Sequence, residues 1–281
     1  MNGSFDLELR VAHDAALAAG AVILSHYDGE VRVEMKAPGD PVTVADRESN
    51  QLIVDALGRA FPDDAILAEE SPVGDFPGSS GAGGGSGADR RWCVDPLDGT
   101  KEFLAKNGEF AVMIGLAVQG RAVLGVVYQP AIDLLLEGVV GVGAWITSRS
   151  DRRPASVSTT SDPASMRLVV SRSHRSPLVD AAKAALRISA ERISGSVGVK
   201  IALLARQEAD LYIHPGRGVK LWDACAPEAI LVAAGGKMTD TRGQLIRYDS
   251  ADPALDRGLI ASNAQAHEAI VAALAGATDA R

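Results

Sequence analysis

Two aspartates stand three residues apart where an apolar stretch runs into a turn, in the segment Val94-Asp95-Pro96-Leu97-Asp98-Gly99-Thr100. Both carboxylates and the Leu97 carbonyl can point into one hollow, and oxygen ligands of this kind suit a hard cation such as Mg²⁺. Gly99 permits a tight backbone at this point. A helix beginning near Thr100 would turn free N–H groups toward a phosphate. The alternative is an ordinary turn, since Asp, Pro and Gly are turn residues.

Further carboxylates occur in two distant segments. Glu69 and Glu70 directly follow a predicted buried strand at residues 65–68, in Ala68-Glu69-Glu70-Ser71. Such a pair marks a metal site or lies on a solvated loop, and alone it favours the loop. Asp223, in Leu221-Trp222-Asp223-Ala224-Cys225-Ala226, is either a helix N-cap or a carboxylate that projects toward a metal.

The segment Asp40-Pro41-Val42-Thr43-Val44-Ala45-Asp46 has two interpretations. Thr43 and Asp46 have the spacing of a helix capping box, which is the structural interpretation. In the functional interpretation, Asp46 is a base that activates a water molecule.

The five histidines show no metal-ligand spacing and no neighbouring serine-nucleophile motif. His174 differs from the others because it ends the segment Ser171-Arg172-Ser173-His174, which follows a predicted strand at residues 167–171. Polar groups at the end of a strand can bind a substrate.

Alternating predicted strands and helices place these residues, so the fold class is α/β or α+β. Periodicity and capping signals predict helices over residues 5–27, 45–61, 197–207, 223–234 and 264–274, and another from residue 177. Apolar runs predict strands at 65–68, 92–94, 110–118, 122–128, 134–140, 167–171, 210–214 and 259–261. Residues 149–165 look polar and irregular.

The chain is expected to be a single unit, residues 1–281, with two packed halves at roughly 1–150 and 151–281. The Gly/Ser-rich segment at residues 74–89 can bury nothing, so it is expected to be a flexible surface loop.

Bulk composition excludes several classes of protein. The 281 residues carry a formal net charge of −8 with a pI of about 5.2, which disfavours nucleic acid and anionic membranes as partners. No signal peptide or long apolar span is found. Cys93 and Cys225 form neither a disulfide framework nor a zinc motif, so a cytoplasmic location is expected.

Taken in order, these motifs resemble the inositol monophosphatase superfamily over essentially the whole chain: Asp46, then Glu69-Glu70-Ser71, then the segment 95–100, then Trp222-Asp223 with Ala234-Gly235-Gly236. The resemblance implies a layered αβαβα sandwich of the inositol monophosphatase / fructose-1,6-bisphosphatase type. It also implies a lithium-sensitive phosphomonoesterase that uses two or three Mg²⁺ ions.

The resemblance further assigns roles to residues. The implied metal ligands are Glu69, Asp95, the Leu97 carbonyl, Asp98 and Asp223. Asp46 and Thr100 match the pair that positions and deprotonates the attacking water, with Glu70 as a further catalytic candidate. Candidates for substrate binding are Gly99, Thr100, Ser171, Ser173, His174, Ser196, Lys200 and Arg217.

Four segments look more specifically like CysQ-type 3′-phosphoadenosine 5′-phosphate phosphatases: Lys101-Glu102-Phe103, Asn107-Gly108-Glu109-Phe110, Gly125-Val126-Val127-Tyr128 and residues 171–174. That likeness implies removal of the 3′-phosphate to give AMP, activity on the sulfated nucleotide, and a place in sulfate assimilation. The alternatives are an inositol-1-phosphate or fructose-1,6-bisphosphate phosphatase, or a non-catalytic metal or nucleotide sensor. The expected partner is a small phosphorylated nucleotide, and the protein is expected to be a monomer or homodimer.

Overall fold

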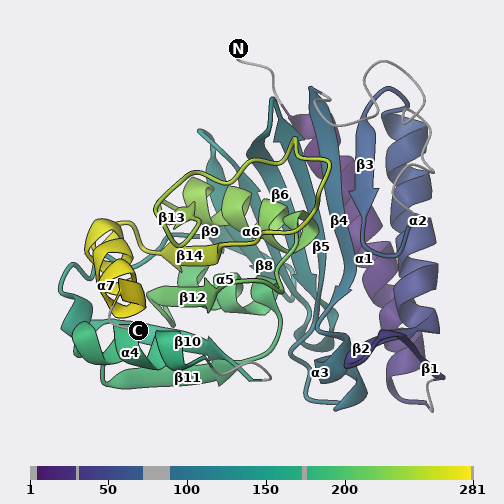
Figure 1. Ribbon diagram of the computed structural model, residues 1–281. Coiled ribbons are helices and arrows are strands. Elements are labelled where there is room, and N and C mark those ends of the chain that lie inside the picture. Colours follow the sequence, from purple (N-terminus) through teal and green to yellow (C-terminus); the bar gives the residue numbers. More distant parts are fainter. Residues whose placement is uncertain (1–4, 30–31, 72–88, 173–175, 280–281) are drawn as a thin grey trace.

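The computed structural model describes residues 5–29, 32–71, 89–172 and 176–279. The elements stack in five layers (Figure 1). Helices α1 (Asp6–Tyr27) and α2 (Val44–Ala60) cover one face of a seven-stranded sheet. Helices α5 (Val197–Ala205) and α6 (Leu221–Ala233) lie between that sheet and a five-stranded sheet. Helices α4 (Pro177–Ala185) and α7 (His267–Asp279) form the last layer, so the predicted αβαβα architecture is confirmed.

The seven-stranded sheet has the order β3-β4-β5-β6-β7-β8-β9. Only the β3–β4 pair is parallel, and every other pair is antiparallel. Its strands are β3 (Ala65–Ala68), β4 (Arg90–Asp98), β5 (Ala111–Val118), β6 (Arg121–Gln129), β7 (Leu134–Val139), β8 (Gly143–Ser148) and β9 (Asp151–Pro154). β4 and β5 are buried almost throughout, since helices cover both faces of the sheet.

The five-stranded sheet has the order β11-β10-β12-β14-β13. β10 runs parallel to β11 and β12, whereas β14 runs antiparallel to β12 and β13. Its strands are β10 (Arg167–Ser171), β11 (Ala190–Ser194), β12 (Leu211–Pro215), β13 (Lys237–Thr239) and β14 (Gly258–Ser262). The chain enters two 3₁₀ turns at Pro130–Ile132 and Pro163–Ser165.

Three apolar clusters fill the spaces between successive layers. The first contains Trp92 and packs under α1 and α2. The second contains Ile230 and joins both sheets through α5 and α6, and the third contains Ile270 beneath α4 and α7. No helix of the described segments has the length and apolarity that a membrane crossing requires.

A row of glycines lets α6 approach the seven-stranded sheet closely. Gly115 on β5 pairs with Gly125 on β6, which pairs with Gly138 on β7. A Cβ atom at Gly115 would lie 2.5 Å from the Ala226 nitrogen, and one at Gly138 would lie 2.6 Å from the Ile230 Cα. Three adjacent positions without side chains therefore form a groove for α6.

Five strands depart from the sequence prediction. The polar stretch before α2 forms a hairpin of β1 (Val33–Ala37) and β2 (Asp40–Thr43), and β9 lies in a segment expected to be irregular. β8 and β11 were not predicted either. β1 and β9 face solvent along their whole length, so they lack the apolar alternation that identifies a half-buried strand. Most of the Gly/Ser-rich segment 74–89 lies outside the described residues.

Candidate active site

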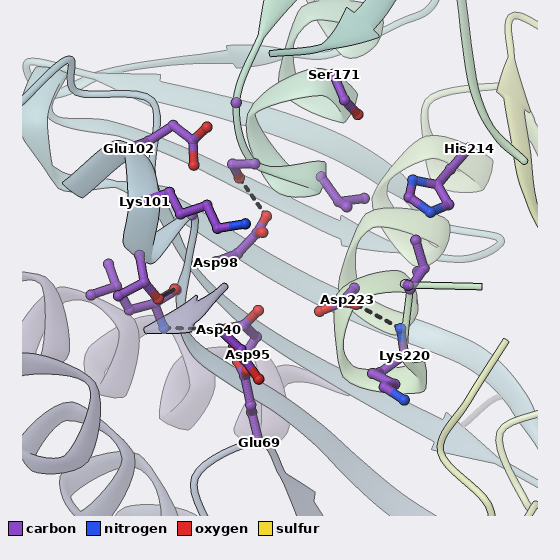
Figure 2. A pocket seen from close by; sticks show the side chains of 18 of the residues that line it. Asp40, Glu69, Asp95, Asp98, Lys101, Glu102, Ser171, His214, Lys220 and Asp223 are labelled. Carbon is purple, nitrogen blue, oxygen red and sulfur yellow. Dashed lines mark hydrogen bonds between the residues drawn. The ribbon is translucent and has the colours of Figure 1, made fainter. Parts of the chain in front are cut away.

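A pocket of about 580 Å³ lies where the carboxyl end of β4 meets the starts of α5 and α6. Figure 2 shows its lining, in which acidic side chains from separate segments face one another. Of the residues predicted from the sequence, the pocket is lined by Glu69, Asp95, Leu97, Asp98, Gly99, Thr100, Ser171, Ser196, Lys200 and Asp223. Residues 120 or more positions apart in the chain thus meet in one site.

The end of β4 presents the two aspartates that the sequence singled out. Pairing with β5 shifts register between Asp95 and Asp98, which is a bulge that re-aims the side chains. Gly99 follows with φ +97°, and a Cβ there would lie 3.0 Å from the Glu109 carbonyl oxygen. Glycine is therefore required by both conformation and space. Thr100 then begins the short helix α3 (Thr100–Leu104), as predicted.

Helix α6 supplies a third carboxylate, that of Asp223, in its first turn. Asp223 is not the N-cap, as one interpretation of the sequence had it: Lys220 is the N-cap residue, and Asp223, three positions later, accepts the Lys220 backbone N–H on its Oδ2 at 2.6 Å. Pro227, inside the same helix, has no N–H to donate to the Asp223 carbonyl four residues earlier. The glycine row brings this helix start toward the end of β4 (Figure 2).

Burial and mutual repulsion dominate the electrostatics of these carboxylates. Burial, followed by the charges of Glu69, Asp98 and Asp223, raises the pKa of Asp95 well above its usual range. Burial, followed by the charges of Asp98 and Glu69, does the same to the pKa of Asp223. Burial also raises the pKa of Glu69 and Asp98. Each of these four acidic groups is hard to ionise on its own. A cation bound by all four would stabilise their charged forms.

The donor set fits a hard divalent cation. The donors that Glu69, Asp95, Leu97, Asp98 and Asp223 offer are carboxylate and carbonyl oxygens, and these are the ligands of Mg²⁺ rather than of zinc or copper. Within the described ranges, no three His, Cys, Asp or Glu side chains already stand at metal-binding spacing. The fit therefore rests on the chemistry and the raised pKa values of the donors.

Lys36 on β1 is a cation already present beside the cluster. Its Nζ donates to Glu69 Oε1 at 2.7 Å and to Glu70 Oε1 at 2.6 Å. Although burial alone would lower the pKa of Lys36, the two glutamates raise it. Glu70 itself is not part of the pocket lining, so the structure places it behind Lys36.

Asp46 lies just behind the pocket and contacts Thr100. Thr100 Oγ1 donates to Asp46 Oδ1 at 3.0 Å, from α3 to α2. The capping box is present as well, because the Thr43 backbone N–H donates to Asp46 Oδ2 at 2.8 Å. Burial raises the pKa of Asp46, against the lowering effect of the hydrogen bonds from Thr43 and Thr100. Both interpretations of this motif are therefore compatible with the structure.

The predicted substrate-binding residues have different surroundings. Ser171 ends β10 at the pocket wall. Lys200 lines the pocket but is only 3% exposed, and its Nζ donates to the Gly195 and Ser196 carbonyls at 3.0 and 2.8 Å. Arg217 does not line the pocket, and its largely exposed side chain pairs with Asp256 at 2.9 Å. Ser173 and His174 lie outside the described residues.

Among the lining residues that sequence reasoning missed are Lys36, Lys101, His214 and Lys220. Lys101 directly follows Thr100, and its ammonium group points toward Asp98 (Figure 2). His214 is the last residue but one of β12, which runs parallel to β10, so it reaches the same sheet edge as Ser171. The carboxyl ends of parallel strands are where ligands bind in α/β proteins, and that rule could have identified His214.

Comparison with known proteins gives consistent matches along the chain. The family model of the inositol monophosphatase family matches residues 6–278. The 3′(2′),5′-bisphosphate nucleotidase CysQ of Escherichia coli (strain K12) is 34% identical over 244 residues, which cover 85% of this chain and 93% of that protein. The inositol-1-monophosphatase of Mesorhizobium japonicum is 34% identical over 240 residues, which cover 84% and 86%.

A solved structure is similar in both fold and sequence. The crystal structure of CysQ from Bacteroides thetaiotaomicron, described as a bacterial member of the inositol monophosphatase family, matches with a TM-score of 0.75 and 30% sequence identity. The match covers 92% of this chain and 97% of that chain, so it includes both sheets and the helices between them.

Proposed function

The chain belongs to the inositol monophosphatase family of phosphatases, and from this premise we propose that it is a Mg²⁺-dependent 3′(2′),5′-bisphosphate nucleotidase. Its reaction would convert 3′-phosphoadenosine 5′-phosphate into AMP and phosphate, with the sulfated nucleotide as a second substrate, in sulfate assimilation. The observation that carries the proposal is the arrangement of four carboxylates in one pocket, beside the hydrogen-bonded pair Asp46–Thr100. The CysQ-type sequence relatives support the choice of substrate.

In this proposal, the residues that hold two or three Mg²⁺ ions are Glu69, Asp95, the Leu97 carbonyl, Asp98 and Asp223. Bound Mg²⁺ supplies positive charge that neutralises phosphate oxygens and lowers the pKa of water. The raised pKa values of these carboxylates support the assignment, because a shared cation removes the repulsion that raises them. Li⁺ is expected to inhibit by competing at these ligands.

Thr100 and Asp46 would prepare the attacking water. The water gives a proton to Thr100 Oγ1, and the Thr100 hydroxyl proton passes to Asp46 Oδ1, which already accepts it in a hydrogen bond. The water oxygen then bonds to phosphorus, while the bond from phosphorus to the ester oxygen breaks and that oxygen takes a proton from solvent; Asp46 afterwards returns its proton to solvent. The raised pKa of Asp46 suits a proton acceptor.

Cations and polar groups along the wall would bind the substrate. Lys101 faces Asp98 and would contact the phosphate that is removed (Figure 2). Lys220 and Arg172 supply positive charge for the second phosphate, and Ser171 and His214 supply hydrogen bonds to the nucleoside. A substrate with two phosphates explains why five cationic side chains line a pocket with so many carboxylates.

A second candidate is hydrolysis of inositol 1-phosphate. The similarity to the Mesorhizobium japonicum enzyme, at the same 34% identity, favours it. In this candidate function the carboxylates and the Asp46–Thr100 pair keep the same roles. Only the contacts between the substrate and the pocket wall differ.

The deciding measurement is phosphate release from 3′-phosphoadenosine 5′-phosphate and from inositol 1-phosphate, each with Mg²⁺, with EDTA and with added Li⁺. We expect release that needs Mg²⁺, falls with Li⁺ and has the higher kcat/KM for the nucleotide. A preference for the inositol ester would select the second candidate. Release from neither substrate would argue for the sensor that the sequence left open.

A further inference from the structure

The turn between β11 and α5 has a strained backbone. Ser196 adopts φ 46° and ψ 140°, although non-glycine residues rarely take a positive φ. Such a conformation persists only when surrounding contacts hold it. Two of the residues that contact this turn are Glu109 and Lys200.

Glu109 holds the turn from the side of the seven-stranded sheet. Its Oε2 accepts the Gly195 backbone N–H at 2.7 Å. The same carboxylate binds Arg172 in a bidentate way, with Nε at 2.9 Å and Nη2 at 2.7 Å. Against the effect of burial, these bonds lower the pKa of Glu109, so it stays ionised. A Cβ at Gly195 would lie 2.3 Å from the Glu102 Cγ and 3.0 Å from the Glu109 carbonyl oxygen, so the turn is in close contact with both residues.

Lys200 holds the turn from the side of α5. Its Nζ donates to the carbonyl oxygens of both Gly195 and Ser196. The side chain is almost fully buried, and its ammonium lies 5.0 Å from the centre of the Tyr212 ring. A buried ammonium with two backbone acceptors fixes both carbonyl groups of the turn.

The Gly195–Ser196 turn, in the conformation that Glu109 and Lys200 stabilise, orients Asp98. Ser196 Oγ donates to Asp98 Oδ2, and the Gly198 N–H donates to the same oxygen at 2.9 Å. Two donors on one oxygen fix the rotation of the carboxylate. Partners behind a metal ligand commonly set its orientation, and their loss costs about 10- to 100-fold in metal affinity.

We propose that Glu109 and Lys200 are positioning residues, which hold the Gly195–Ser196 turn so that Ser196 orients Asp98 toward the bound cation. The inference rests on the proposed role of Asp98 as a Mg²⁺ ligand. It also connects segments far apart in sequence, because Glu109 precedes β5 whereas the turn follows β11. Lys200 thereby acts on the site through the backbone, in addition to any contact that it makes with substrate.

The test is calorimetric Mg²⁺ binding to the full chain without substrate, together with melting temperature, kcat and KM. Glu109→Ala and Lys200→Met should weaken Mg²⁺ binding about tenfold and lower kcat more than they raise KM. Glu109→Gln keeps an acceptor for the Gly195 N–H, so it should recover part of the affinity. The control Glu208→Ala removes a surface glutamate that also pairs with arginines, and it should bind Mg²⁺ like the wild type.

The outcomes separate this inference from the proposed function. Wild-type protein that binds no Mg²⁺ overturns both. Wild-type binding with unchanged affinity in Glu109→Ala, accompanied only by a lower melting temperature, overturns the positioning role alone. If Lys200→Met does not fold, the comparison of Glu109→Ala, Glu109→Gln and Glu208→Ala still decides the matter.

Discussion

Asp46 uses its two carboxylate oxygens for two partners: Oδ1 accepts the Thr100 hydroxyl at 3.0 Å, and Oδ2 accepts the Thr43 backbone N–H at 2.8 Å. One oxygen thus serves the pocket, and the other caps α2. A motif that looks like an ordinary helix cap in the sequence can therefore carry chemistry as well.

Substitution can separate these two roles. Asp46→Asn should lower kcat by about a hundredfold or more with little change in KM, because the amide cannot accept the proton passed on by Thr100. Thr43→Ala removes the cap and the hydrogen bond from the Thr43 hydroxyl to Asp46 Oδ2 but keeps the Thr100–Asp46 pair, so it should cost about 1 kcal/mol of the free energy of unfolding while kcat falls far less than in Asp46→Asn. Steady-state kinetics and urea denaturation measure both. Equal loss of stability in both variants with normal kcat would leave Asp46 with the capping role alone.

Asp223→Asn should have opposite effects on stability and on metal binding. The neutral amide removes a buried charge, so the metal-free protein should become more stable, because burial and neighbouring acids raise the pKa of Asp223. Mg²⁺ binding should weaken by more than tenfold. Melting temperatures with EDTA and with Mg²⁺ test this prediction. A variant that melts lower in EDTA and still responds fully to Mg²⁺ would contradict the ligand role.

Glu228, on α6 and away from the pocket, should make stability depend on pH. Burial raises its pKa to about 7, against the hydrogen bond from Tyr248 and the charge of Arg121. Between its usual pKa of 4.5 and about 7, the folded protein keeps a proton that the unfolded chain releases, so the free energy of unfolding falls as pH rises. Glu228→Gln should flatten this slope in urea denaturation from about pH 5 to about pH 8. An unchanged slope would show that other groups cause it.

Lys101 should bind the phosphate that is removed. Lys101→Met is expected to raise KM for 3′-phosphoadenosine 5′-phosphate and to weaken inhibition by inorganic phosphate, each by about tenfold. Because a positive charge that faces Asp98 disappears, Mg²⁺ affinity should stay the same or rise. The control Lys183→Met breaks a surface pair with Glu191 and should leave both constants unchanged. Unchanged inhibition by phosphate in Lys101→Met would remove Lys101 from the site.

Sequence patterns predicted the buried part of the fold well. The strand at 65–68 and the strand at 167–171 match β3 and β10 residue for residue, because apolar runs between turn signals identify buried strands. Glu69, Asp95, Asp98 and Asp223 of the pocket were also found, since each stands at the end of a predicted element. Exposed edge strands such as β9 were missed because packing does not constrain their composition.

Contacts between segments far apart in the chain could not be predicted from the sequence. Glu109 and Gly195 are 86 residues apart, and no local pattern marks Glu109 as a partner of that turn. Lys200 looked like a phosphate-binding lysine, and only the structure shows that two backbone carbonyls accept its hydrogens. Side-chain partners of this kind depend on how the layers pack.

The row formed by Gly115, Gly125 and Gly138 predicts a specific pattern of mutational tolerance. A methyl group at any of the three would meet the backbone of α6, so even Gly→Ala should displace the helix that carries Asp223. Positions that tolerate no substitution should then lie across three neighbouring strands and along the axis of α6, instead of along a single strand. A saturation-mutagenesis map would show these positions as a continuous line that ends at the pocket. Selection for activity would therefore retain glycine at positions that do not contact a substrate.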